Sequence, residues 1–346
     1  MNKIVQIEDD LDLLTSMVSA YSNAPLIYQQ GPYWKEKVKR STRDIKKYGI
    51  SNFRNSESTI STSYGDGTLL NAAHGYTGVK YSLAKYLTAL FPFNKIYSSQ
   101  LVLTSSYIKD LVRLENWVLN HSERVNELLN KYRINEGSLI GNPDRSSFVK
   151  GVRHSHFAIH MLDLLDTMID DHITDKHSSY MELGGGFGMN LYLMVHNFQS
   201  IKKYLYIDIA PNLYVSTQFL KANFGDAVKD FDYFNKNDSI EFQSNNELEI
   251  YCLLPQQIES FQSKVDIFHS ANTRAEIPKQ AVRNYSSQVK RILSAQGRML
   301  ISSYGQFNLE STFDPDELSN LFGVKFKTFD KNLILGNYIP QKFYVG

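Results

Sequence analysis

The stretch "YMELGGGFGMN", residues 180–190, contains four of the chain's nineteen glycines within five positions. Glycine inside a helix or a strand lowers stability, so such a cluster usually marks a tight turn or a place where a ligand approaches the main chain. The residues before the cluster predict a short buried strand, and the apolar residues after it, at helical spacing, predict a helix. The cluster therefore predicts a strand, a bare turn and a helix in succession.

The second half of the chain alternates strand-like and helix-like segments. Further strands are predicted at 204–209, 248–254, 265–271 and 297–304, and helices at 188–198, 212–225 and 278–297. Such alternation indicates a parallel sheet with helices on both faces, an α/β fold. The tail, residues 324–340, instead predicts two adjacent strands, which would form an antiparallel hairpin at one edge of the sheet.

The first half of the chain has a different pattern, mainly helical and irregular. Apolar residues keep helical spacing at 11–18 and again at 111–118. Residues 134–147 contain two glycines, a proline and several turn formers, which makes this segment the best candidate for a domain junction. We expect a mainly helical region over 1–140 and an α/β domain over 141–346.

Length, charge and cysteine content exclude several classes of protein. The 346 residues carry a net charge of +1, which gives no reason to expect a nucleic acid or a membrane as partner. The lone cysteine, Cys252, excludes a cysteine-rich zinc site. The amino-terminal residues lack the apolar core of a signal peptide, and no apolar run approaches the roughly 20 residues that span a bilayer. A cytoplasmic protein is expected.

The glycine turn has a specific pattern, in which Glu182 is followed by Gly184, Gly186 and Gly188 at alternate positions. A dinucleotide fingerprint would place its third glycine at position 189, which is Met189, and a Walker loop would need a Lys-Ser/Thr pair. The pattern is instead that of Rossmann-like S-adenosylmethionine-dependent methyltransferases. That cofactor carries no phosphate, so the turn need not be cationic, and the following helix favours the cofactor's carboxylate at its amino end.

An acidic residue is expected at the end of the next strand, where it would accept hydrogen bonds from both ribose hydroxyls. Asp208 lies there, twenty residues after Gly188. Aspartate is a poor strand residue, so its position among apolar neighbours requires an explanation. The alternative is that Asp208 caps the helix that follows.

Several segments resemble a family of bacterial sugar O-methyltransferases associated with surface-polysaccharide and glycoside biosynthesis. The matching segments are 31–54, 141–151, 182–188, 204–209, 253–259 and 265–276. The resemblance implies a Rossmann-like methyltransferase sheet and methyl transfer to a hydroxyl of a sugar, or of a glycosylated or nucleotide-linked metabolite. The last of these segments ends in Thr-Arg-Ala-Glu-Ile, which departs from the family's pattern and leaves the acceptor open.

The cofactor is expected at the carboxyl ends of the parallel strands, where such folds bind their ligands. The expected cofactor-binding residues are Glu182, Gly184, Gly185, Gly186, Phe187, Gly188, Asp208, Ile209, Leu254, Pro255, Ser270 and Asn272. Leu254 and Pro255 would contact the adenine.

A sugar hydroxyl is a weak nucleophile, so a general base or a metal ion should help to remove its proton. Glu276 and His269 are the candidates within the α/β domain, although His269 could be a core residue and Glu276 a helix cap. Arg274 could hold a phosphate on the acceptor or pair with Glu276. His154 is a further catalytic candidate, because segments before the first strand of such folds often lie over the crevice.

A metal is possible but has no clear motif. On a helix His156, His160 and Asp163 would share one face, but the Glu of H-E-x-x-H and a further ligand are missing, so a structural role is favoured. We therefore assign no metal ligand.

The acceptor, a small molecule or a glycan, is expected beneath a lid formed by the amino-terminal half. Its expected contacts are Trp34, Arg54, Tyr64, Arg153 and Arg274. The alternative is a helical oligomerisation module, which would make the protein a homo-oligomer. Two other functions stay open: methylation of a phenol or an amine on a non-sugar metabolite, and a non-catalytic module that binds the cofactor.

Overall fold

The computed structural model describes residues 7–54, 122–143, 146–169, 172–235, 238–271, 277–304, 314–331 and 341–346. The α-helices are α1 (Leu11–Ser22), α2 (Pro32–Tyr48), α6 (Ser122–Lys131), α7 (His156–Met168), α8 (Met189–Asn197), α9 (Ala210–Phe224), α10 (Phe231–Phe234), α11 (Lys279–Ile292) and α12 (Pro315–Phe322). The 3₁₀ helices are η1 (Leu26–Tyr28), η4 (Glu136–Leu139), η6 (Gly225–Ala227) and η7 (Pro255–Ser260). The strands are β1 (Ser146–Val149), β2 (Val152–Ser155), β3 (Ser179–Leu183), β4 (Lys203–Ile207), β5 (Val228–Lys229), β6 (Glu249–Leu253), β7 (Val265–Ala271), β8 (Leu293–Tyr304), β9 (Lys327–Lys331) and β10 (Gln341–Val345).

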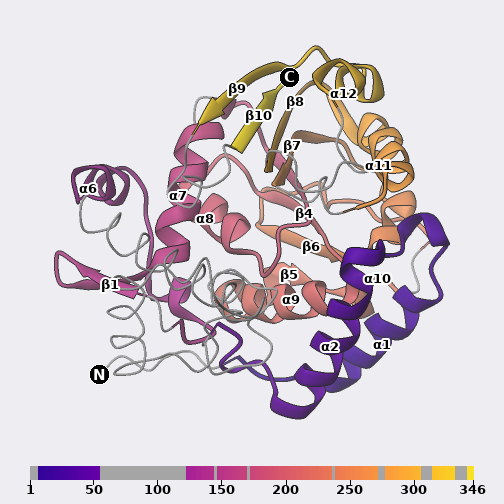
Figure 1. Ribbon diagram of the computed structural model, residues 1–346, viewed down its shortest axis with the longest axis horizontal. Helices are drawn as coiled ribbons and strands as arrows, with labels where there is room; N and C mark the ends of the chain where they lie inside the picture. The colour runs from indigo at the N-terminus through magenta and orange to yellow at the C-terminus, as the bar shows by residue number, and fades with distance from the viewer. Residues whose placement is uncertain are drawn as a thin grey trace, which may run out of the picture.

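The main sheet has eight strands in the order β5-β6-β4-β3-β7-β8-β10-β9 (Figure 1). The strands from β5 to β8 run parallel, and β10 pairs antiparallel with both β8 and β9. The chain passes from β3 to β4 on one side and later returns to β7 on the other, so the strand order reverses beside β3. Ligands of open α/β sheets bind at such a reversal. The predicted Rossmann-like, mostly parallel sheet with an antiparallel edge is confirmed.

Helices cover both faces of the sheet, which explains the continuous apolar character of its central strands. Every residue of β3, β4 and β6 is buried. Alternate side chains enter two different core clusters: Tyr180 and Tyr206 pack with the residues of α7, α8 and α9, whereas Met181 and Ile207 pack with those of α11 and α12.

The amino-terminal helices share the core of the sheet domain. Leu13, Leu14 and Met17 of α1 are buried in the same cluster as Leu213 and Leu220 of α9. In Figure 1, α1 and α2 lie beside α9, at one side of the sheet. The described part of the first half is mainly helical, as predicted, and it is packed on the domain that follows it. The division at residues 140 and 141 stays a prediction.

The element boundaries differ from the predictions in three places. The helix predicted over 278–297 ends at Ile292, because Leu293 is already extended and pairs with Val265 as the first residue of β8. The second strand of the edge hairpin is β10, which lies beyond the predicted range 324–340. The β1–β2 hairpin was not predicted, and the helix predicted at 111–118 lies outside the described residues.

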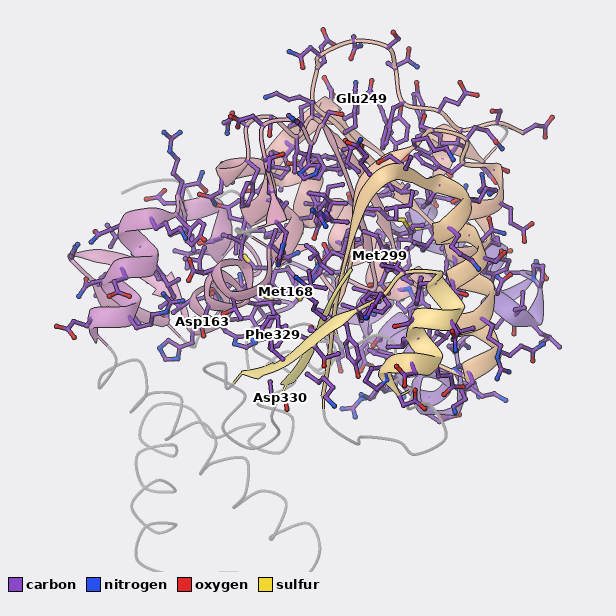
Figure 2. All side chains as sticks on the ribbon, turned by 90° about the horizontal axis from the view of Figure 1, so that it is seen from above. Asp163, Met168, Glu249, Met299, Phe329 and Asp330 are labelled. Carbon is purple, nitrogen blue, oxygen red and sulfur yellow. The ribbon has the colours of Figure 1, made fainter. Side chains whose placement is uncertain are left out.

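A buried ion pair joins the amino ends of β4 and β6. Lys203 of β4 and Glu249 of β6 lie 3.2 Å apart, Nζ to Oε2, and both are largely buried. Figure 2 shows Glu249 at the edge of the molecule opposite to Phe329 and Asp330 of β9. In the part of the chain that the structure describes, no helix has the length and apolar character needed to cross a bilayer.

Candidate cofactor site

The turn after β3 brings the bare main chain to the carboxyl edge of the sheet. Gly186 has a φ of +67°, a conformation that residues with a side chain rarely adopt, and a Cβ placed there would meet no atom within 4 Å. At Gly185 a Cβ would lie only 2.6 Å from the Glu182 Cδ and from the Tyr206 Cε2. The turn is thus filled on the side of Gly185 and open on the side of Gly186, where a ligand could approach the main chain.

Asp208 directly follows β4 and faces this turn. Its Oδ2 accepts a hydrogen bond of 3.0 Å from the Gly186 amide, and its Oδ1 accepts from the Ile209 amide at 2.7 Å and from Asn212 Nδ2 at 3.3 Å. Helix α9 begins with Ile209 at its N-cap and has no side-chain cap. Asp208 therefore binds the glycine turn and does not cap the first turn of α9, contrary to the alternative expectation.

Burial makes the Asp208 carboxyl group an unusually weak acid. Asp208 is 7% exposed, and this burial raises its pKa to about 7, with a further increase from the Glu182 carboxylate. The hydrogen bonds from Ile209, Gly186 and Asn212 act in the opposite direction. A ligand that donates hydrogen bonds to Asp208 would stabilise its ionised form.

The sequence did not predict that Tyr206 would hold the turn as well. Its hydroxyl donates a hydrogen bond of 2.8 Å to the Gly186 carbonyl, and the Gly184 amide donates to the Ile207 carbonyl at 2.8 Å. Residues 206 and 208 lie on the same face of an extended chain, so strand alternation could have indicated this partner. The turn is therefore fastened to β4 through both its amide and its carbonyl groups.

Beneath the turn lies a buried polar cluster made of Tyr180, Glu182, Asn190 and His269. His269 Nδ1 is 2.7 Å from the Tyr180 hydroxyl, 3.1 Å from Asn190 Nδ2 and 3.4 Å from Glu182 Oε1. Asn190 Nδ2 also donates to the Tyr180 hydroxyl and to Glu182 Oε1, at 2.8 and 3.1 Å. His269 has no exposed surface. Its Nε2 has no hydrogen-bond partner among the described residues, and its burial fits the core alternative of the prediction.

The one side chain in the middle of the turn, Phe187, is anchored by aromatic contacts. Its ring lies 5.2 Å from those of Phe53 and Phe219 and 5.5 Å from that of Phe157. The Arg54 guanidinium lies over the same ring at 4.8 Å. Phe187 therefore fixes the turn to three other parts of the chain and points away from the open side.

The remaining cofactor-binding candidates lie on the neighbouring strands. The Ser270 hydroxyl donates to the Leu183 carbonyl at 3.1 Å, and Leu254 and Pro255 are buried where β6 passes into η7. The Leu254 amide donates to Gln257 Oε1 at 2.9 Å. Asn272 lies outside the described residues.

The expected acceptor contacts are not gathered in one place by the described residues. Arg54 is fully buried, and its guanidinium donates to the carbonyls of Ser138 and Ile140 and to the Ser155 hydroxyl. This makes Arg54 a structural anchor and argues against its predicted contact with an acceptor.

The contacts of Arg153 and Trp34 neither favour nor oppose a role in acceptor binding. Arg153 donates to the Ser146 hydroxyl at 2.8 Å and to the Pro143 carbonyl at 2.6 Å, within the segment that holds the β1–β2 hairpin. Trp34 is half-buried on α2, with Lys37 Nζ 4.9 Å from its ring. Tyr64 and Arg274 lie outside the described residues.

Of the catalytic candidates, Glu276 and Arg274 lie outside the described residues. His154 is 6% exposed at the end of the β1–β2 hairpin, and burial lowers its pKa, so its imidazole is neutral at physiological pH. A neutral imidazole can accept a proton, which keeps His154 among the candidates for a base.

The three residues on the predicted face of α7 are buried and serve the core. Asp163 pairs with Arg124 at 3.0 Å, and burial lowers the pKa of His160 to about 4. Among the described residues, no group of three or more histidine, cysteine, aspartate or glutamate side chains could hold a metal ion.

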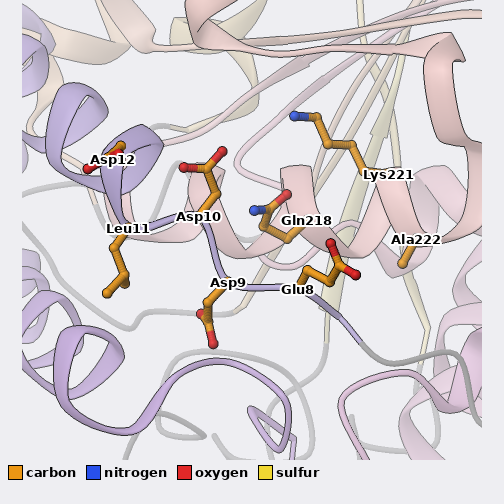
Figure 3. A pocket seen from close by; sticks show the side chains of 8 residues that line it. All are labelled: Glu8, Asp9, Asp10, Leu11, Asp12, Gln218, Lys221 and Ala222. Atoms are coloured by element: carbon orange, nitrogen blue, oxygen red, sulfur yellow. The ribbon is translucent and has the colours of Figure 1, made fainter.

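A separate acidic groove of about 650 Å³ lies along the carboxyl-terminal half of α9 (Figure 3). Its lining residues are Glu8, Asp9, Asp10, Leu11, Asp12, Gln218, Lys221 and Ala222. None of them belongs to the glycine turn or to the end of β4, and Lys221 already pairs with Asp230. Asp208, by contrast, precedes the amino end of α9. The groove is therefore distinct from the site at the turn.

The turn, Asp208 and the start of α8 together have features that suit a neutral or zwitterionic ligand. Asp208 offers carboxylate oxygens, Gly186 offers an open main chain, and α8 begins at Met189 immediately after the turn, so its positive end faces the same edge. Vicinal hydroxyls suit the first of these features, and a ligand carboxylate suits the last.

No family model matches the chain, and no curated protein matches it. Solved structures resemble about half of it. The PH0226 protein of Pyrococcus horikoshii is 11% identical with a TM-score of 0.37, over 52% of this chain and 86% of that chain. An S-adenosylmethionine-dependent methyltransferase from Clostridium acetobutylicum is 10% identical with a TM-score of 0.33, over 54% and 89%. Haemonchus contortus phosphoethanolamine N-methyltransferase 2, in complex with phosphomonomethylethanolamine and S-adenosylhomocysteine, is 9% identical with a TM-score of 0.37, over 54% and 51%. Likeness at this level says nothing about what the present chain binds or acts on.

Proposed function

We propose that the protein is an S-adenosylmethionine-dependent O-methyltransferase that acts on a hydroxyl of a sugar or of a glycosylated or nucleotide-linked metabolite. The observation that carries the proposal is the hydrogen bond between the Gly186 amide and the Asp208 carboxylate, which brings a bare turn and an acidic strand end together. The cofactor is an intracellular metabolite, so the proposal places the reaction in the cytoplasm.

The residues at and beside the turn fit this cofactor in four ways. Asp208 would accept hydrogen bonds from the two ribose hydroxyls, and the open side of Gly186 would let the main chain approach the ligand. The start of α8 would face the cofactor's carboxylate. Leu254 and Pro255, buried after β6, would border the adenine.

When bound, the cofactor supplies an electrophilic methyl group on a sulfonium. The protein's part is to align the acceptor oxygen and to remove its proton. Because His269 lies in the core beneath the turn, we assign the removal of the acceptor's proton to Glu276, with His154 as the second candidate base. Arg274 is proposed to hold an anionic group of the acceptor.

The choice of a sugar hydroxyl rests on the resemblance of the sequence segments and on the aromatic side chains of the amino-terminal half. A phenol or an amine on a non-sugar metabolite is the competing acceptor. A non-catalytic cofactor-binding module is the competing class, and it predicts cofactor binding without turnover.

Calorimetric titration with S-adenosylmethionine and S-adenosylhomocysteine, with NAD as control, tests the proposal. Binding of both methyl-cofactor forms, abolished in Asp208→Ala, would support it. A folded wild-type protein that binds neither form would overturn it. Turnover with a panel of sugar acceptors, lost in Glu276→Gln while S-adenosylhomocysteine binding persists, would then separate an enzyme from a binding module.

A further inference from the structure

The amino-terminal helix α1 places a buried hydroxyl close to Asp208. Tyr21, in the last turn of α1, is 2% exposed, and its hydroxyl has no hydrogen-bond partner among the described residues. The main chain of Gln30 approaches this hydroxyl without the geometry of a hydrogen bond. Burial raises the pKa of Tyr21, and the Asp208 carboxylate, which is close enough to interact with it, raises this pKa further. A buried hydroxyl without a partner is unusual and requires an explanation.

Two side-chain amides, one bonded to Asp208 and one bonded to the residue before Tyr21, also have an unpaired oxygen. Asn212 uses its Nδ2 to donate to Asp208, and Gln256 uses its Nε2 to donate to the Ala20 carbonyl at 3.4 Å. These contacts fix the orientation of both amides, because only their nitrogens can donate. Asn212 Oδ1 and Gln256 Oε1 are buried, and neither has a partner among the described residues. This part of the molecule therefore has more hydrogen-bond acceptors than donors.

The segment that carries Tyr21 is held firmly on the sheet domain. The Tyr28 hydroxyl, in η1, donates to Glu259 Oε1 of η7 at 2.6 Å, and the rings of Tyr28 and Tyr285 of α11 lie 5.9 Å apart. Gln256, which binds Ala20, lies on η7 directly after β6. The end of α1 is thus fixed beside the carboxyl ends of β4 and β6, the edge at which parallel α/β sheets bind their ligands.

We propose that α1 completes the cofactor site, with the Tyr21 hydroxyl forming a hydrogen bond to the adenosine half of the cofactor and the oxygens of Asn212 and Gln256 accepting from its donors. The inference rests on the proposed function. Beyond the two ribose hydroxyls assigned to Asp208, adenosine supplies the two N–H bonds of its exocyclic amino group, which are the donors that this surplus of acceptors requires. The amino-acid end of the cofactor carries a carboxylate, which Asp208 would repel, so this end does not suit the position beside Tyr21.

The test compares Tyr21→Phe with Tyr251→Phe as a matched control, because Tyr251 is as buried as Tyr21 and its hydroxyl already donates to the Glu241 carbonyl at 3.1 Å. Calorimetry measures the binding of S-adenosylhomocysteine and of methylthioadenosine, which lacks the amino-acid end. We expect Tyr21→Phe to bind both ligands about 3- to 10-fold more weakly, the effect of one hydrogen bond, and Tyr251→Phe to bind them as the wild type does. Because the Tyr21 hydroxyl has no hydrogen-bond partner in the described part of the chain, the melting temperature of ligand-free Tyr21→Phe should not fall.

Three results would overturn the inference, and each is distinct. Unchanged affinity of Tyr21→Phe for both ligands would show that the hydroxyl does not touch the cofactor. A loss seen only with S-adenosylhomocysteine would assign Tyr21 to the amino-acid end. A folded wild-type protein that binds neither ligand would instead remove the proposed function, and this inference would fall with it.

Discussion

The Gly186 amide and the Asp208 carboxylate are joined by a hydrogen bond of 3.0 Å, although 22 positions separate them in the chain. The bond ties the turn after β3 to the end of β4, and the Tyr206 hydroxyl repeats the tie at the carbonyl of the same glycine. Contacts with strand β4 therefore hold the turn in place. The carboxyl group of Asp208 is buried there, and this burial opposes its ionisation.

This burial should make Asp208 a cost to stability at neutral pH. Its pKa is about 7 in the folded state against 3.8 in the unfolded chain, so the folded state binds more protons between these values. Its contribution to stability is therefore present below pH 4 and is lost as the pH rises to about 7. We expect ligand-free Asp208→Asn to be more stable than the wild type at pH 8, by about 1–4 kcal/mol, and similar to it near pH 4. Urea unfolding at the two pH values measures this difference. A wild type that is the more stable of the two at pH 8 would contradict it.

Cofactor binding should depend on the same ionisation, with the opposite sign. Ribose hydroxyls donate to the ionised carboxylate, so protonated Asp208 must lose its proton before binding. The affinity for S-adenosylhomocysteine should rise about tenfold from pH 6 to pH 8 and level off above pH 7. Calorimetry across this range, with Asp208→Asn as a control that lacks the pH dependence, decides the matter. An affinity that falls as the pH rises is incompatible with this role of Asp208.

Gly185→Ala should damage the turn through lack of space. The added Cβ would lie 2.6 Å from Glu182 and Tyr206, which are both buried and cannot withdraw easily. Overpacking of this kind costs about 1–3 kcal/mol, and we expect weaker cofactor binding as well. The control is Gly225→Ala, at a φ of +55° with no atom within 4 Å of the new Cβ, which should cost about 1 kcal/mol from backbone strain alone and leave binding intact. Thermal unfolding and calorimetry report the two effects, and equal affinity in both variants would contradict the proposed geometry of the turn.

Arg54→Lys separates a structural role from acceptor binding. The guanidinium is fully buried and serves two carbonyls, one hydroxyl and the ring of Phe187, a set that an ammonium cannot reproduce. We expect a loss of about 2–4 kcal/mol in the free energy of unfolding. Arg153→Lys, at the partly buried hairpin, should cost less than half as much. If Arg54→Lys keeps its stability and loses only turnover, the acceptor role predicted from the sequence is restored.

The sequence predicted the features that depend on neighbouring residues. The strand, the glycine turn and helix α8 follow one another along the chain, and Asp208 is recognisable because an acid interrupts an apolar strand. Gly225 ends α9, as predicted. The end of α11 was wrong, because pairing of Leu293 with β7 overrides the helical pattern.

The roles of single side chains depend on contacts that the local sequence does not encode. Arg54 has a charged side chain of the kind that often binds ligands. Its hydrogen-bond partners, however, lie 84 to 101 positions away in the sequence and enclose it. His269 was predicted with a core alternative, and its contacts with Tyr180 and Asn190, which the local sequence does not indicate, favour that alternative. Tyr21 was not singled out, because an apolar helix face looks the same whether its tyrosine meets the core or a binding site.

The enclosure of Phe187 has a consequence for how the chain folds. Its ring is covered by Phe53 from the amino-terminal part, Phe157 from α7 and Phe219 from α9, so the packing around this side chain is complete only when all three are in place. A fragment that begins at residue 141 would lack Phe53 and would leave this face of the turn uncovered. The amino-terminal segment and the sheet should then melt in one cooperative transition, and a ligand held at the turn would protect the amides of α1 from hydrogen exchange as strongly as those of α8.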